Sequence, residues 1–471
     1  MIRTLGKILS ESSLLFLFLH TMCVFWIVKC GALIHYDLIK RNSPPRLSPY
    51  SRYNLTLYIL NDSLSTRYTA KGTYIMRNLV SIKTIDKIEP IENADRIETA
   101  IIGGWSVVTQ KGIHSVGDKV AYFEIDTLLP EDNPLFAEYV ERGTKTGKSP
   151  YTGKKVKGHV LRTIKLRGQY SQGTIMPLSV IGLSADATQE DINAWMESNG
   201  VFKYEPPAAM TSGDIKGNFP SVMIRNDSDH PVQVRKTDSE RVQNLKDAFL
   251  QSLDPEDWFA TEKIDGTSFT AVCTDAGEVR IASRNYEIEP ISDEEIAADV
   301  IRYETDQAEA DKVEQEAIAN GEDMETFKRP RVKKLKEKSV YQVIAEDLNL
   351  FEAMEPGQLI QGEIVGPNIQ GNKLKFDEIQ FFVFHTEGIA EGSDLYETVI
   401  RPRRVPVIDM QLPRTVAEAI AQVDGMKSTL NPKVLAEGVV WWNKKGDVFK
   451  ETGMRPNFKA INNKFLLKHE E

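Results

Sequence analysis

Thr261-Glu262-Lys263-Ile264-Asp265-Gly266-Thr267-Ser268 is the stretch on which the interpretation of this chain depends. It ends an alternating run, WFATEKI, that is typical of a β-strand. Lys263 and Asp265 project to the same face of such a strand, so a cation held by the carboxylate can lie beside the amine. A lysine attacks phosphorus only as the free amine, which requires desolvation or a nearby cation to lower its pKa from about 10.4. Gly266 allows a close backbone approach to a ligand.

Five further motifs follow this stretch in a fixed order. Ser283-Arg284-Asn285 comes after one predicted hairpin, which brings Arg284 within reach of a phosphate bound beside the lysine. The other four are QGEIVGP (361–367), FFVF (381–384), AEGVV (436–440) and FKAINNK (458–464). Each motif alone fits an ordinary turn, a core strand or a solvated lysine. The fixed order of all six is much harder to attribute to chance.

The chain predicts an α+β protein with two β-rich domains. Residues 76–190 form short alternating runs between Gly and Asp turns, which favours an OB-like β-barrel that binds nucleic acid. We interpret residues 191–220 as a linker and residues 221–471 as a domain built on an antiparallel sheet. A stretch rich in Glu, Ala and Lys at about 291–345 predicts an exposed helical insertion.

Basic and aromatic residues gather in the predicted barrel. They could track a phosphate backbone and stack on bases, although a solvated face is the plainer alternative. The residues are Lys154, Lys155, Lys157, Arg162, Lys165, Arg167, Trp105 and Tyr170. If this domain grips the nucleic acid around a break, deleting residues 76–190 is expected to impair strand sealing more than lysine adenylylation.

The first 75 residues differ in character from the rest. Residues 14–34 are apolar enough for a membrane anchor or an uncleaved signal, but His20 and Lys29 interrupt them. We favour an over-extended N-terminus, which leaves anchoring or organelle targeting open. The three cysteines form no disulfide framework, which favours the cytoplasm or another reducing compartment. The net charge of −10 neither supports nor excludes nucleic-acid binding, because basic residues can gather in one groove.

The motif order resembles the covalent nucleotidyltransferases, the superfamily of ATP-dependent polynucleotide ligases and mRNA capping enzymes. Within it, EKIDGTSFT, QGEIVGPNIQ, FFVF and EGVV resemble the RNA ligases, most of all the Deinococcus type with an N-terminal OB-like domain. The resemblance covers residues 76–471. It implies an ATP-dependent RNA ligase that uses Mg²⁺ or Mn²⁺ and seals nicked or broken RNA, with an RNA/DNA hybrid duplex as a further candidate substrate. No obligate protein partner is evident, and a monomer is expected.

The resemblance also implies a role for each motif. Lys263 would become AMP-linked, and Asp265, Glu363 and Glu437 would hold the waters of the catalytic cation, a hard metal suited to oxygen ligands. Glu262 would contact the adenine, Phe384 would stack on it, and Arg284 and Lys459 would bind phosphates. The nucleotide-binding set is therefore Glu262, Lys263, Arg284, Glu363, Phe384, Lys459 and, by a looser match, Arg241.

One position departs from the family pattern. Related ligases often carry a second lysine two residues after the first in the last motif, and here that position is Ile461. Either Lys459 acts alone or Lys464 assists it.

Two alternative functions remain open. A DNA ligase or an mRNA guanylyltransferase would carry an OB domain after the last lysine motif, whereas only 12 residues follow Lys459 and the OB-like segment lies upstream. A non-catalytic nucleic-acid-binding protein is the alternative from another class. The presence of the lysine and of all three proposed carboxylates argues against it.

Overall fold

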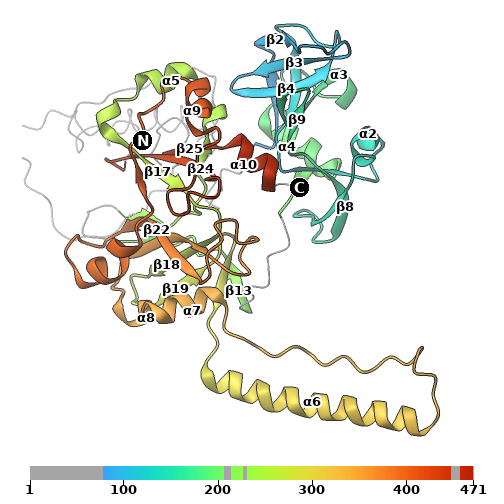
Figure 1. Ribbon diagram of the computed structural model, residues 1–471, viewed down its shortest axis with the longest axis vertical. Helices are drawn as coiled ribbons and strands as arrows, with labels where there is room; N and C mark the ends of the chain where they lie inside the picture. The colour runs from blue at the N-terminus through green and yellow to red at the C-terminus, as the bar shows by residue number, and fades with distance from the viewer. Residues whose placement is uncertain (1–77, 206–213, 226–230, 447–456, 470–471) are drawn as a thin grey trace, which may run out of the picture. The chain divides into compact units, whose positions relative to one another are not determined.

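The computed structural model describes residues 78–205, 214–225, 231–446 and 457–469 (Figure 1). The leader that the sequence predicts at 1–75 lies outside these residues. Within them, no helix combines the length and the apolar character needed to cross a membrane.

Short strands dominate residues 78–205, as the alternating pattern predicts. One sheet joins β1 (Val80–Thr84), β5 (Lys119–Phe123) and β11 (Thr174–Pro177), and a second joins β2 (Lys87–Pro90), β3 (Ile97–Ile102) and β4 (Trp105–Gln110). A third pairs β9 (Thr163–Leu166) with β10 (Gln169–Gln172), and a fourth has the order β12 (Phe202–Lys203), β6 (Thr127–Pro130), β8 (Lys155–Val160), β7 (Lys145–Lys148). The short helices are η1 (Pro134–Phe136), α2 (Ala137–Val140) and α3 (Leu178–Ile181).

Helix α4 (Gln189–Ser198) belongs to this first domain. Thr188 and Asp191 form a capping box that starts the helix, and Ile192 and Met196, one turn apart, enter the same core as Phe123. Strand β12 then pairs with β6. The predicted linker at 191–220 therefore begins too early, because a capped amphipathic helix and a strand occupy its first part. Its last part also differs, since β13 (Asp214–Asn218) pairs with β20 in the next domain.

The second domain contains two larger sheets. The six-stranded sheet has the antiparallel order β13, β20 (Tyr286–Glu289), β19 (Val279–Ala282), β18 (Thr267–Cys273), β21 (Leu359–Val365), β22 (Gln380–Glu387). The five-stranded sheet has the order β16 (Glu240–Arg241), β25 (Asn457–Ile461), β24 (Gly438–Asn443), β17 (Trp258–Lys263), β23 (Val407–Ile408). A two-stranded ribbon pairs β14 (Met223–Ile224) with β15 (Val232–Gln233). The sequence predicts antiparallel pairing, and β16 departs from it by pairing with β25 in parallel.

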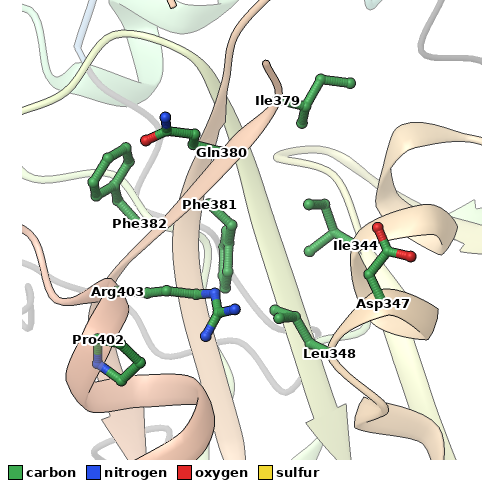
Figure 2. A pocket seen from close by; sticks show the side chains of 9 residues that line it. All are labelled: Ile344, Asp347, Leu348, Ile379, Gln380, Phe381, Phe382, Pro402 and Arg403. Carbon is green, nitrogen blue, oxygen red and sulfur yellow. The ribbon is translucent and has the colours of Figure 1, made fainter.

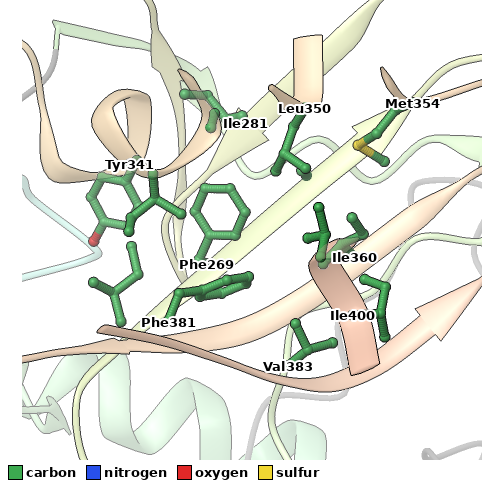
Figure 3. Packing of buried hydrophobic residues seen from close by; sticks show 14 of the residues in the cluster. Phe269, Ile281, Tyr341, Leu350, Met354, Ile360, Phe381, Val383 and Ile400 are labelled. Atoms are coloured by element: carbon green, nitrogen blue, oxygen red, sulfur yellow. The ribbon is translucent and has the colours of Figure 1, made fainter. Parts of the chain in front are cut away.

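Apolar residues of β18, β21 and β22 build the core of the six-stranded sheet (Figure 3). Phe269 is fully buried, meets Phe381 edge-on at 5.0 Å between ring centroids and stacks on Tyr341. Helices α7 (Val340–Asp347) and α8 (Leu350–Ala353) contribute Tyr341 and Leu350 to this core. The opposite faces of the same strands remain available for the candidate site.

The predicted helical insertion contains one long helix. Ser292 and Glu295 form a capping box that starts α6 (Asp293–Ala319), and residues 320–338 return without helix. The remaining helices are α5 (Asp247–Ser252), α9 (Val416–Val423), α10 (Asn463–His469) and the short turns η2 (Val242–Asn244), η3 (Pro255–Asp257), η4 (Tyr396–Ile400) and η5 (Arg401–Arg403). The predicted α+β fold class is confirmed.

Candidate active site

Strand pairing brings motifs that are far apart in the sequence to one place. Lys263, at the end of β17, pairs with Gly438 at the start of β24, which puts Glu437 next to the lysine. Glu363 of β21 pairs with Ser268 of β18. Lys459 of β25 pairs with Val440 on one side and with Arg241 on the other. The register of two sheets thus gathers the predicted lysines and carboxylates.

The Lys263 amine lies among carboxylates. Its Nζ donates a hydrogen bond to Glu437 Oε2 at 2.6 Å. Burial lowers the pKa of Lys263, but Glu437, Glu363 and Asp265 together outweigh it, so the pKa lies above its ordinary value. The sequence predicts a lowered pKa for Lys263, whereas in the structure the surrounding carboxylates favour the protonated amine.

The pKa values of Asp265 and Glu363, the two other carboxylates near Lys263, are also shifted. Burial, followed by the charge of Glu437, raises the pKa of Asp265 to about 6, while Lys373 and Lys263 oppose the shift. Burial raises the pKa of Glu363 to about 8, although Lys263 lowers it. Lys373 Nζ lies 3.1 Å from Asp265 Oδ1 and 3.0 Å from Oδ2. Asp265 and Glu363 thus depend on nearby positive charge to ionise.

The predicted cation ligands do not form a preassembled site. Among the residues that the structure describes, no group of three or more His, Cys, Asp or Glu side chains is placed to hold one metal ion. Lys263 engages Glu437 and Lys373 engages Asp265. The donor set still fits a hard cation, because oxygen ligands of like charge gather here and a cation would relieve their repulsion.

Basic residues also gather near Lys263 and Asp238. Arg284 pairs with Asp238, and Arg284 and Lys459 hold the pKa of Asp238 well below its ordinary range although burial raises it. Burial lowers the pKa of Lys459 to about 7, and the positive charges of Lys263, Arg241 and Arg284 add to the effect. The buried Arg241 guanidinium lies 5.9 Å from the ring centroid of Trp105. Such a cluster suits the phosphates of a nucleotide.

Groups suited to bind a flat aromatic ring come from β17, where Glu262 directly precedes Lys263, and from β22. Glu262 is 2% exposed, and its Oε2 accepts hydrogen bonds from the backbone amide of Thr429, at 2.8 Å, and from the Thr429 hydroxyl. Its Oε1 is buried and has no hydrogen-bond partner among the described residues. Phe384 is half-buried and stacks on Trp442 at 6.1 Å between centroids. An unsatisfied carboxylate oxygen and an aromatic face are what adenine recognition requires.

Comparisons with known proteins show what this chain is similar to. A family model described as RNA ligase matches residues 256–461, and one described as an OB-fold domain matches residues 79–178. Three structures of Naegleria gruberi RNA ligase are similar, a mutant with AMP and Mn (27% identity, TM-score 0.61), a mutant with ATP and Mn (27%, 0.59) and the ligase with pyrophosphate (28%, 0.58). Each covers 84% of this chain and 99% of the Naegleria chain. These matches support an ATP-dependent RNA ligase with an upstream OB-fold domain. No curated protein sequence matches it significantly.

The RNA ligase domain and the upstream OB-fold domain predicted from the sequence are thereby confirmed. The finer assignment to the Deinococcus type stays a prediction. The Naegleria structures carry AMP, ATP, pyrophosphate or Mn, which are the ligand classes that the sequence predicts for this RNA ligase.

Three residues of this RNA ligase act differently from the prediction. Gly266 leaves room for protein rather than for a ligand, because a Cβ there would lie 2.2 Å from the Ile364 carbonyl oxygen of β21. Trp105 is fully buried and its Nε1 donates to Asn244 Oδ1, so it cannot stack on bases. Tyr170 instead donates a hydrogen bond to a carboxylate of the ligase domain.

The departure at Ile461 has a structural reason. Ile461 is 3% exposed and packs with Ile125 of the OB-fold domain and Leu466 of α10. A lysine would place its charge in that contact. Lys464 does not replace it, because its Nζ pairs with Asp424 at 3.0 Å on the exposed side of α10. The structure therefore leaves Lys459 as the basic residue that the last motif directs into the site.

Sequence reasoning missed three residues of the RNA ligase site. Lys373 pairs with Asp265, Thr429 fixes Glu262, and Asp238 pairs with Arg284. Lys373 and Thr429 lie in loops without a recognisable motif. Asp238 stands three residues before Arg241, and its position beside a candidate phosphate-binding residue was the available signal.

A separate pocket of about 400 Å³ lies beside β22 and α7 (Figure 2). Asp347 and Arg403 face it, and none of the predicted site residues lines it. It is therefore not the nucleotide site.

Proposed function

We propose that this ATP-dependent RNA ligase joins a 3′-hydroxyl to a 5′-phosphate through a lysyl-AMP and an RNA-adenylate, and that it repairs nicked or broken RNA. The observation that carries the proposal is the Lys263 amine, which contacts Glu437 at 2.6 Å and faces a cluster of phosphate-binding groups. Nicked RNA/DNA hybrids are a further candidate substrate, and we expect the enzyme to act as a monomer.

The reaction begins with the α-phosphate of ATP. Lys263 Nζ loses a proton, for which Glu437 Oε2 is the nearest base, and attacks the α-phosphorus while pyrophosphate leaves. Arg284 and Lys459 bind the phosphates, and Glu262 and Phe384 hold the adenine. Bound at Asp265, Glu363 and Glu437, Mg²⁺ or Mn²⁺ would neutralise the carboxylates and the transferring phosphate. AMP then passes to the RNA 5′-phosphate, and the 3′-hydroxyl displaces it.

The lysyl-AMP step is tested directly with α-labelled ATP. Wild-type protein with Mg²⁺ is expected to acquire one covalent AMP on Lys263, located by peptide mass spectrometry, and to seal a nicked RNA duplex. Lys263→Ala should remove both the label and the sealing. Lys464→Ala is the matched control, because Lys464 pairs with Asp424 and not with the carboxylates near Lys263. Label on Lys263→Ala, or sealing by it, would overturn the proposal.

The choice of nucleotide and of strand separates the alternatives. ATP rather than GTP should label the protein, and nicked RNA should be sealed in preference to nicked DNA. Labelling by GTP would instead indicate a capping enzyme, and faster sealing of DNA would indicate a DNA ligase.

A further inference from the structure

The insertion between β20 and α7 consists of helix α6 and a non-helical return segment, and the two carry opposite charges. Helix α6 contains ten acidic and two basic residues. The last part of the return, residues 328–338, contains seven basic residues and one acidic residue. We refer to α6 and residues 320–338 together as the arm (Figure 1). Its charge is thus separated along two adjacent segments.

Side chains of α6 form hydrogen bonds with the backbone of the return segment at several residues. Arg302 bonds Asp299 and Asp306, and its guanidinium also donates to the carbonyl oxygens of Lys333 and Lys334 at 3.3 Å. Asp299 Oδ2 accepts from the Lys336 amide at 2.7 Å. The backbone of the return segment is therefore held by α6 although it forms no helix or strand of its own.

Ion pairs extend this attachment to both ends of the return segment. Arg329 pairs with Asp311 and, at 3.4 Å, with Glu314. Lys338 pairs with Asp293 at the first turn of α6 at 2.8 Å. Acidic residues of the helix are thus used to hold the basic segment in place.

Five basic residues of the return segment are exposed, and three of them are not engaged by a described carboxylate. Lys328, Arg331 and Lys333 are exposed, and no ion pair with another described residue engages them. The unpaired positive charge stands on a backbone that α6 holds in place. Such a place attracts a polyanion, because neutralising phosphates releases their counterions.

We propose that Lys328, Arg331 and Lys333 form a phosphate-binding edge that grips an RNA duplex at a distance from the ends being joined. The proposal rests on the RNA ligase function above. The 27-residue helix is about 40 Å long, so the arm can reach a part of the duplex that the reaction site does not contact. Binding is to the backbone and independent of sequence, because a row of basic side chains reads no base edges.

The test neutralises the edge in the full-length enzyme. A Lys328→Gln, Arg331→Gln, Lys333→Gln variant is compared with wild type on nicked RNA duplexes with long and with short flanks. We expect binding to the long duplex to weaken about tenfold or more, and the slope of log affinity against log salt to become shallower by roughly 2 to 3. Binding to the short duplex and adenylylation of Lys263 should stay as in wild type.

The matched control neutralises three acidic residues of the same arm instead of three basic ones. Glu304→Gln, Glu309→Gln, Glu316→Gln should leave RNA affinity unchanged or raise it. If the basic variant binds the long duplex as wild type does, or if both variants weaken it equally, the proposal is overturned. A wild-type protein that neither adenylylates nor seals would contradict the proposed function instead, so the two failures are distinguishable.

Discussion

The pKa of Lys263 is set by two opposing effects. Burial favours the free amine, whereas the charges of Glu437, Glu363 and Asp265 favour the ammonium and prevail. Neutralising the carboxylates would leave burial as the dominant effect and lower the pKa. We infer that the nucleophile becomes reactive only when positive charge is bound at the carboxylates, which couples activation to the presence of the substrate complex.

Lys373→Met is expected to change the pH dependence of adenylylation. Asp265, with a pKa of about 6, contributes to holding a cation only when ionised, so its protonation adds to the loss of activity as the pH falls through that pKa. Lys373 lowers the pKa of Asp265, so removing it raises this pKa further. The acidic limb of the pH–rate profile should therefore move to higher pH by about one pH unit. Lys464→Met is the control, and an unmoved limb in Lys373→Met would contradict the assignment.

Lys459→Arg should remove the dependence of the KM for ATP on pH above about pH 7. Lys459 has a pKa of about 7, so it is protonated and able to bind phosphate below that pH and becomes neutral above it. The KM for ATP of the wild type should rise about tenfold between pH 7 and pH 9, because a charge-assisted hydrogen bond is lost. Arginine stays charged throughout this range, so the KM of the variant should stay nearly constant. Parallel pH profiles of the two proteins would show that Lys459 does not bind the nucleotide.

Strands were the most predictable elements of this fold. The alternating runs that end at Lys263 and begin at Gly438 are strands, and their pairing follows because both carry a buried apolar face. Elements fixed by long-range contacts were not predictable. The parallel pairing of β16 with β25 joins residues more than 200 positions apart, and the return segment 320–338 depends on contacts with α6 rather than on its own propensity.

The candidate site was predictable where residue type and strand position together determine it. Lys263, Glu363, Glu437 and Lys459 meet because each lies at or beside a strand of the two sheets. The partners of these residues were not predictable. Lys373 comes from a loop, and no local pattern indicates that a loop will fold back onto Asp265.

Gly266→Ala should destabilise the protein through the packing of β18 against β21. A Cβ at this position would lie 2.2 Å from the Ile364 carbonyl oxygen, so one strand must shift. We expect the free energy of unfolding to fall by about 1 to 3 kcal/mol in denaturant titrations. Gly217→Ala is the control, because a Cβ at Gly217 has no neighbour within 4 Å among the described residues. Equal losses in both variants would mean that the close approach at Gly266 is unimportant.

The two domains of the described chain meet through specific contacts rather than through a linker alone. The Gly104 amide donates to the Gln243 carbonyl at 3.2 Å, and Trp105 Nε1 donates to Asn244 Oδ1 at 2.9 Å. These contacts lie next to Arg241, whose guanidinium is over the Trp105 ring. Deleting the OB-fold domain would therefore disturb a candidate phosphate-binding residue, which argues against a clean division between sealing and adenylylation.

Trp105→Phe tests this coupling with the OB-fold domain in place. Phenylalanine keeps the ring in the core but removes the hydrogen bond to Asn244, so the segment that carries Arg241 loses a fixed neighbour. The KM for ATP in adenylylation should rise about fivefold, the equivalent of roughly 1 kcal/mol for one hydrogen bond. Trp195→Phe is matched to it, because Trp195 Nε1 donates at 2.9 Å to the Ile181 carbonyl oxygen inside the same domain, remote in sequence from Arg241. A rise in KM that is equal in the two variants would trace the effect to general loosening of the OB-fold domain, whereas a rise confined to Trp105→Phe makes the domain contact part of nucleotide binding.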